Sequence, residues 1–418
     1  MRGTGSRHRQ DDRIVLVGHP YAPMGRGEDL RGAFRALRAL GLDVAIRDIY
    51  AWDPPDPGLA RELGEFVGPS LSSHTNVFYV NGDEVEPVID RLGGRAVGAR
   101  HIICPQWELG TYPRTWAAQL DRFDEIWAPS RFVLSALRGT VSRPVRRVPL
   151  AVQPRMTSFL PRRHFGLPES SYLFLFLFDF RSYVDRKNPF GVIDAFGRVC
   201  MLRPRADTFL VIKLNGVDAT ERIARAYQRF LDAVARSESR DRIIVLDRVL
   251  SDNESKNLIR ECDCFVSLHR SEGFGRGMAE AMLFGKPVVA TGYSGNLEFM
   301  NERNSCLVRY RLVDVREGQY PYSEGQVWAD PEVDHAVDYM VGLLDDRDRG
   351  RELGREAACD MATYFSARAV GLAMAAQLAG GLGRGSEIRT LGPWEDGACR
   401  GPAGPREAGP VACRERAR

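Results

Sequence analysis

The sequence predicts an α/β protein built from two doubly wound units that face each other. Three observations support this fold class. From Arg13 onward, short β-branched or aromatic runs alternate with longer segments of helical period, the pattern of a parallel sheet with crossover helices. A Pro- and Arg-rich stretch at 149–168 interrupts the alternation, and a second alternating series follows it. With 418 residues, the chain is long enough for two separate cores.

The first unit is expected over residues 13–165, after a flexible tail at 1–12. A strand at 13–17 leads into a Gly- and Pro-rich loop at 18–27. The helical pattern at 29–40 then ends at Gly41, a residue suited to follow a helix. Further strands of this unit are expected at 76–80, 101–104, 124–128 and 145–148.

The second unit is expected over residues 166–365. Its strands are predicted at 173–178, 208–213, 242–246, 264–268 and 287–290. Helical periods return from Pro331 to about Gly380. Residues 381–418 are rich in Gly, Pro and Arg and have almost no periodicity, so we expect a disordered tail there.

The composition is that of an ordinary globular protein, with 44% hydrophobic and 27% charged residues. A net charge of +3 is too small to indicate nucleic acid as the main partner. The eight cysteines form no CxxC pair and no zinc spacing, so we interpret them as reduced thiols. The N-terminus has no apolar signal region, and the apolar run at 172–178 is too short to cross a bilayer as a helix. A cytoplasmic protein is expected, with attachment at the inner face of the membrane left open.

The sharpest local signal is the stretch 269–282, where a strand runs into a Gly-rich turn and then a helix. Glycines at 273, 275 and 277 let the backbone approach a ligand closely, and the amides at the helix start face an anion. Glu272 and Glu280 flank this turn, eight positions apart. Carboxylates repel phosphate but accept hydrogen bonds from hydroxyls. The stretch therefore predicts a site for a diphosphate with sugar rings on either side.

A second signal follows the first strand of the second unit. Arg181 and Lys187 lie on one loop, which ends where Asn188 or Pro189 starts a helix. Ligands of doubly wound sheets bind at the carboxyl ends of the strands. Two fixed cations at that edge fit a pyrophosphate clamp.

These residues carry a resemblance to a known family. The segment from Glu272 to Glu280 resembles the E-x7-E signature of retaining family-four glycosyltransferases, also called glycosyl transferases group 1. The Arg-Lys-Asn-Pro loop and the segments 127–130 and 290–296 are also similar to this family, and the resemblance covers roughly residues 13–375. It implies the GT-B fold, in which two Rossmann-like domains face each other across a cleft. It also implies that a helix at 366–380 packs back toward the N-terminal domain.

The resemblance implies a binding mode for a nucleoside-diphosphate sugar. Glu272 would bind hydroxyls of the donor sugar beside the anomeric carbon, and Glu280 would bind the ribose. Arg181 or Arg186, together with Lys187, would neutralise the diphosphate. Arg181 lies five positions before the Arg-Lys-Asn-Pro motif, on the same loop.

Three neighbours in the turn complete this donor site. Phe274 and Gly275 would offer backbone amides, and Arg276 begins the helix that follows. Departure of the nucleoside diphosphate builds negative charge on its β-phosphate, which preorganised cations and amides stabilise. The resemblance therefore implies a retaining transferase that needs no metal or other cofactor. The one Asp-x-Asp, at 346–348, is interpreted as a solvated loop between helices.

The acceptor side departs from the family pattern. Gly25 and Gly27 stand where the family has a Gly-rich loop near the diphosphate, although a plain tight turn explains them equally well. Many relatives carry a histidine after a mid-domain strand, whereas this sequence has Glu108 in that region. Glu108 is our candidate for contacting the acceptor hydroxyl. The alternative is a partly buried acid that pairs with Arg114 or Arg122.

Two further features have competing interpretations. His269 could reach the ligand pocket or be a satisfied core histidine. Arg31, Arg35 and Arg38 form a stripe at helical spacing that could dock on an anionic membrane, as a lipid-linked acceptor would require. An ordinary amphipathic helix accounts for the same stripe.

The sequence thus predicts transfer of a sugar from a nucleoside diphosphate to a hydroxyl acceptor, which could be a glycan, a lipid-linked molecule or a small molecule. The alternative is a catalytically weak sugar-nucleotide-binding or partner subunit of the same fold. A dinucleotide oxidoreductase is a more distant alternative, because the first loop lacks the spaced G-x-G-x-x-G.

Overall fold

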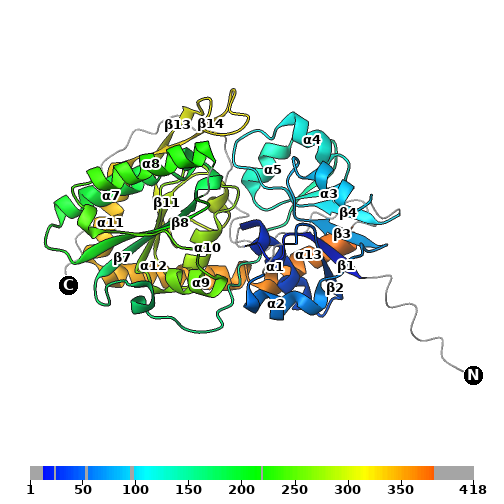
Figure 1. Cartoon of the computed structure of the whole chain (residues 1–418), viewed down its shortest axis with the longest axis horizontal. Helices are drawn as coiled ribbons and strands as arrows, with labels where there is room; N and C mark the ends of the chain where they lie inside the picture. The colour runs from blue at the N-terminus through cyan, green and yellow to red at the C-terminus, as the bar shows by residue number, and fades with distance from the viewer. Residues whose placement is uncertain (1–12, 23–24, 52–54, 95–97, 218–219, 381–418) are drawn as a thin grey trace, which may run out of the picture.

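A computed structural model describes residues 13–22, 25–51, 55–94, 98–217 and 220–380. Two six-stranded sheets, each with helices packed on its faces, form two bodies side by side (Figure 1). This architecture confirms the predicted fold class. The tails expected at 1–12 and 381–418 lie outside the described residues.

The N-terminal sheet has the order β2-β1-β3-β4-β5-β6, and all its pairs are parallel. Its strands are β1 (Ile14–Gly18), β2 (Val44–Asp48), β3 (Thr75–Phe78), β4 (Arg100–Ile103), β5 (Glu125–Ala128) and β6 (Val145–Arg147). All but β2 lie within a residue or two of the positions predicted from the sequence.

The C-terminal sheet has the order β12-β11-β10-β7-β8-β9 and is also parallel throughout. Its strands are β7 (Tyr172–Asp179), β8 (Thr208–Asn215), β9 (Ile243–Leu246), β10 (Cys264–Ser267), β11 (Val288–Thr291) and β12 (Cys306–Val308). The strand β7 is buried on both faces, which explains its unbroken run of apolar residues. Its even-numbered side chains enter one core of this domain, and Leu173 and Leu175 enter the other.

Helices connect the strands of both sheets. Those of the N-terminal half are α1 (Gly25–Arg38), α2 (Pro57–Leu63), α3 (Val85–Arg91), α4 (Arg114–Leu120) and α5 (Arg131–Leu137). Those of the C-terminal half are α6 (Val184–Lys187), α7 (Pro189–Leu202), α8 (Glu221–Arg236), α9 (Asp252–Glu261), α10 (Arg276–Leu283), α11 (Val333–Asp345), α12 (Arg347–Tyr364) and α13 (Ala367–Gly380). The helix α1 begins within the predicted Gly-rich loop, four residues earlier than the periodicity indicated.

The chain crosses between the two domains twice, and a backbone hydrogen bond links the two crossing segments. The backbone N–H of Val152 donates to the carbonyl oxygen of Phe365, at 2.8 Å. After the second passage, α13 packs along α1 of the N-terminal domain (Figure 1). The contact is close, because a Cβ at Gly371 would lie 2.3 Å from the carbonyl oxygen of Ala36.

A two-stranded antiparallel sheet extends the C-terminal domain. It consists of β13 (Tyr310–Asp314) and β14 (Val327–Pro331). The segment 315–326 joins the two strands on the side that faces α4 and α5 (Figure 1). We call this segment the strap.

Candidate active site between the two domains

The turn between β10 and α10 holds Glu272 in a defined position. Gly275 ends the turn with φ +95°, a conformation that glycine adopts without strain. A second turn, at Gly295, packs directly on the first. A Cβ at Gly295 would lie 2.1 Å from the carbonyl oxygen of Gly273, so only glycine permits this approach. The backbone N–H of Glu272 donates to the Ser294 hydroxyl at 2.8 Å. Glu272 is thereby fixed with only 8% of its surface exposed.

Two cations from α6 contact the Glu272 carboxylate. The Lys187 ammonium donates to Oε1 at 2.5 Å, and the Arg186 guanidinium lies 3.1 Å from Oε2. Burial alone would raise the pKa of Glu272, but Lys187 and Arg186 together lower it to about 2. Burial lowers the pKa of Lys187, and Glu272 opposes that shift. The short helix after β7 therefore brings two positive charges to the carboxyl edge of the sheet, as the sequence predicted for Lys187.

Glu108 approaches this cluster from the N-terminal domain. It follows β4, and its Oε1 lies 3.8 Å from Nη2 of Arg186. Its Oε2 accepts a hydrogen bond of 2.5 Å from the hydroxyl of Tyr320, a strap residue. The charged partner of Glu108 in this cluster is thus Arg186 of the opposite domain rather than Arg114. Glu108 and Glu272 lie on the two sides of one guanidinium group.

The second carboxylate of the signature is paired with a lysine. Lys256, on α9, donates to Oε1 of Glu280 at 2.6 Å, and both side chains are more than nine-tenths buried. Burial raises the pKa of Glu280, and Lys256 opposes that shift. Glu280 therefore lies in the same turn–helix unit as Glu272, but its carboxylate is directed to α9.

Arg276 crosses the boundary between the domains. Its guanidinium donates to Oδ1 of Asp29 on α1 at 2.7 Å and to the carbonyl oxygen of Ala151 at 3.2 Å. The other carboxylate oxygen of Asp29 accepts a 2.9 Å hydrogen bond from the Gln106 amide. Gln106 in turn adjoins the Glu272 turn, because a Cβ at Gly273 would lie 2.7 Å from its Oε1.

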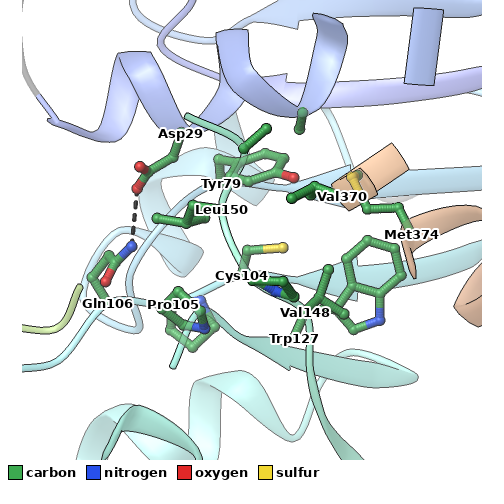
Figure 2. Close-up of a pocket in the computed structure, with 14 residues that line it drawn as sticks. Asp29, Tyr79, Cys104, Pro105, Gln106, Trp127, Val148, Leu150, Val370 and Met374 are labelled. Atoms are coloured by element: carbon green, nitrogen blue, oxygen red, sulfur yellow. Dashed lines mark hydrogen bonds between the residues drawn. The ribbon is translucent and has the colours of Figure 1, made fainter. Parts of the chain in front are cut away.

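A pocket in the N-terminal domain opens beside this polar contact. Figure 2 shows Asp29 and Gln106 at one edge and apolar side chains around the remainder. Its lining includes Ala33, Tyr79, Cys104, Trp127, Val148, Leu150, Val370 and Met374. The helices α1 and α13 and the carboxyl ends of the N-terminal strands thus surround one hollow, adjacent to the turn that carries Glu272.

Comparison with known proteins relates the C-terminal half to a known family and the whole chain to a known fold. The model of the family described as glycosyl transferases group 1 matches residues 162–311, which include both β7 and the Glu272–Glu280 turn. The chain is a glycosyltransferase of the GT-B fold. No curated protein sequence matches it.

Solved structures share the fold of this glycosyltransferase over most of its length. Sucrose-phosphate synthase from Thermosynechococcus elongatus aligns with a TM-score of 0.63 and 15% identity, covering 88% of this chain and 98% of that chain. The E. coli trehalose-6-phosphate structure bound with UDP-2-fluoro glucose aligns at 0.62 and 10% identity, with the same coverage. A glycosyltransferase from Rickettsia africae aligns at 0.56 and 14% identity, again with this coverage.

Three other predicted donor-site residues of the glycosyltransferase lie outside the Glu272 ion-pair cluster. Arg181 is exposed, and its backbone N–H donates to Asp179 at 2.8 Å. The side chain of Phe274 is in the core, against Phe299 and Phe365, and the donation expected from its backbone amide stays a prediction. His269 is fully buried and contacts Ser267 and Asn296, and burial lowers its pKa. Its surroundings match the interpretation as a satisfied core histidine.

At the start of α1, the structure requires glycine at one of the two candidate positions. A Cβ at Gly27 would lie 2.4 Å from the carbonyl oxygen of Ala22, whereas Gly25 has open space. The close approach at Gly27 is to the protein's own loop, as a tight turn requires. In the arginine stripe, Arg31 is only 2% exposed and pairs with Glu28, which also pairs with Arg35. With these two arginines engaged inside the protein, the stripe does not form a membrane-facing surface.

Sequence reasoning missed several residues of this site. Lys256 and Tyr320 contact Glu280 and Glu108, yet both lie outside the motifs on which the sequence prediction rests. Arg26 donates to Asn81 at 2.8 Å, while its Nε and Nη2 have no partner among the described residues. The one sequence feature that pointed to Lys256 is that the chain has only four lysines.

Two searches of the described residues complete the description. They contain no group of three or more His, Cys, Asp or Glu side chains placed to hold a metal ion. None of their helices is both long and apolar enough to span a membrane.

Proposed function

We propose that this glycosyltransferase moves a sugar from a nucleoside diphosphate to a hydroxyl acceptor, with retention of anomeric configuration and without a metal ion. One observation carries the proposal: Lys187 and Arg186 converge on Glu272 at the domain boundary, where Glu108 faces them. The UDP-2-fluoro glucose bound in the E. coli trehalose-6-phosphate structure is consistent with a sugar nucleotide as the donor class.

The cations would stabilise the leaving group. As the bond between the anomeric carbon and the diphosphate breaks, negative charge develops on the β-phosphate, and fixed positive charges nearby lower the barrier. A diphosphate beside Lys187 would compete with Glu272 for its ammonium group. The Glu272 carboxylate could then accept hydrogen bonds from sugar hydroxyls. Glu280, whose pairing with Lys256 would have to loosen, would accept them from the ribose.

The reaction exchanges one bond for another at the anomeric carbon. The bond to the β-phosphate oxygen breaks, and the acceptor oxygen bonds to the same face of the sugar. The acceptor's proton passes to the departing diphosphate. Glu108 would orient the acceptor hydroxyl by accepting its hydrogen bond, since it approaches from the N-terminal domain.

The test is a donor screen followed by substitution. Thermal unfolding with UDP-, GDP- and other activated sugars should reveal one class that stabilises the protein, because a ligand at about 100 times its Kd adds about 2.7 kcal/mol. With that donor, Lys187→Ala should reduce transfer by about 10²–10³-fold. Glu272→Ala should reduce it as well.

Lys286→Ala is the matched control. Lys286 is another of the four lysines, follows α10 and is only partly buried. Its substitution should leave transfer unchanged. Full activity of Lys187→Ala and Glu272→Ala would overturn the proposed mechanism. Donor binding without transfer to any acceptor would instead indicate the alternative, a sugar-nucleotide-binding partner subunit.

A further inference from the structure

The strap leaves the C-terminal domain and is held on the N-terminal domain by hydrogen bonds. The Gln326 amide both accepts from the backbone N–H of Thr111, at 3.1 Å, and donates to its carbonyl oxygen, at 2.9 Å. Farther along, the Thr115 hydroxyl on α4 donates to the Tyr322 hydroxyl at 3.3 Å. These hydrogen bonds hold a segment of the C-terminal domain against the residues that follow β4 in the N-terminal domain.

Tyr320 is the strap residue that reaches the site. Its ring packs against Tyr183, with centroids 4.9 Å apart, and against Trp107, at 5.7 Å. Only 9% of Tyr320 is exposed. Aromatic neighbours on two sides leave the ring little freedom, so its hydroxyl has a defined direction.

That hydroxyl is directed at Glu108. It donates to Oε2 at 2.5 Å, while the other carboxylate oxygen lies 3.8 Å from Arg186. Arg186 also contacts Glu272, at 3.1 Å, and its guanidinium lies 5.8 Å from the Tyr320 ring centroid. One oxygen of Glu108 is therefore held by the strap, and the other faces the cations that we assign to the donor.

We propose that Tyr320 is a positioning residue, which holds the Glu108 carboxylate in the orientation needed to receive the acceptor hydroxyl. The proposal rests on the proposed function of Glu108. Tyr320 exchanges no proton with either substrate and acts only through the hydrogen bond to Glu108. An interaction of this kind matters because displacing a reacting group by about 1 Å can cost up to about 100-fold in rate.

The hydroxyl remains a donor at neutral pH. Burial raises the pKa of Tyr320 well above its usual range, and the negative charge of Glu108 adds to the shift. The strap therefore offers Glu108 a neutral, protonated phenol that the surrounding ring contacts keep in place.

The experiment is a double-mutant cycle on the full chain, with the donor found by the screen above. Tyr320→Phe keeps the ring and removes only the hydroxyl. We expect kcat for transfer to fall about tenfold, while the donor Kd measured by calorimetry stays within about twofold. In a Glu108→Ala background the same substitution should have no further effect, because Tyr320 acts through the group already removed.

Tyr322→Phe is the matched control, since it removes a hydroxyl from the same strap without a contact to Glu108. It should leave kcat unchanged. A Tyr320→Phe variant that transfers at the wild-type rate, or that lowers kcat equally with and without Glu108, would overturn the proposal. Failure of the proposed function is distinct, because the wild-type chain would then transfer no sugar from any donor.

Discussion

Glu272 is a carboxylate that stays ionised although it is almost completely buried. Moving such a charge out of water is costly unless cations compensate it. Lys187 and Arg186 both contact it, and Arg186 also faces Glu108, so two positive charges meet two negative ones. A diphosphate that binds beside Lys187 would therefore have to displace Glu272 from the lysine.

The pH dependence of stability follows from the same contacts. The pKa of Glu272 in the folded protein, about 2, lies below the ordinary value of 4.5. Its charge therefore stabilises the fold fully above about pH 4.5, and this stabilisation is lost as the pH falls towards 2. We predict that wild type loses about 3 kcal/mol of unfolding free energy relative to Glu272→Gln over that range. Urea unfolding of both proteins at several pH values measures the difference, and a constant difference would contradict the prediction.

At the residue scale, the sequence revealed the groups that lie next to backbone signals. Glu272 follows an apolar strand within a glycine-rich turn, and Lys187 precedes an Asn-Pro helix start. Tyr320 and Lys256 could not be found in this way, because only the fold brings Tyr320 to Glu108, 212 positions away. No local pattern encodes such a contact.

At the scale of elements, the sequence predicted ten of the twelve parallel strands and neither strand of the antiparallel pair. The parallel strand β12, a buried run of three residues, was missed along with β2. The strand β7 is an unbroken apolar run that is buried on both faces. By contrast, β13 is largely exposed, and β2 is short and half-buried, with Arg47 and Asp48 at its end. These two strands form because a partner strand is available, so their own sequences carry little of the signal.

The packing of α13 on α1 leads to a prediction about one glycine. Gly371→Ala would place a methyl group 2.3 Å from the carbonyl oxygen of Ala36 and push the helices apart. We expect it to destabilise the protein by about 1–3 kcal/mol, as overpacking typically does, measured by urea unfolding.

Gly342→Ala is the control for helix propensity. Gly342 lies within α11, and its added Cβ would meet nothing within 4 Å. We expect a gain of up to about 1 kcal/mol, since alanine favours helices over glycine. If both substitutions changed stability by the same amount, the close helix contact would not be limiting.

For the whole molecule, the two domains meet through an apolar contact and through polar groups. Tyr320 and Trp328 share one core with Trp107 of the N-terminal domain. The polar contacts include the Arg276–Asp29 pair, the Ser130 hydroxyl donating to the carbonyl oxygen of Gly273, and Glu298 pairing with Arg147. The arrangement of the domains therefore depends in part on a few specific charged groups.

Asp29→Asn tests this dependence. It removes the charge that faces the largely buried Arg276 guanidinium, which should cost this arrangement of the domains about 3–5 kcal/mol. Small-angle X-ray scattering should then show a larger radius of gyration. Asp330→Asn removes a carboxylate that pairs with Arg270 and Arg311 inside the C-terminal domain, and should leave the radius unchanged. An equal radius for wild type and Asp29→Asn would show that this pair does not hold the domains together.

The return of α13 to α1 also sets the order in which the protein can be completed during synthesis. The apolar face of α1, which includes Leu37, packs with Val370 and Met374 in one core. A nascent chain that has reached only residue 366 has all the strands of both sheets but lacks this cover. The N-terminal domain is synthesised first, but its core is completed only when α13 arrives, some 220 residues after its final strand. At typical elongation rates of about 5–20 residues per second, this delay is roughly 10–45 seconds.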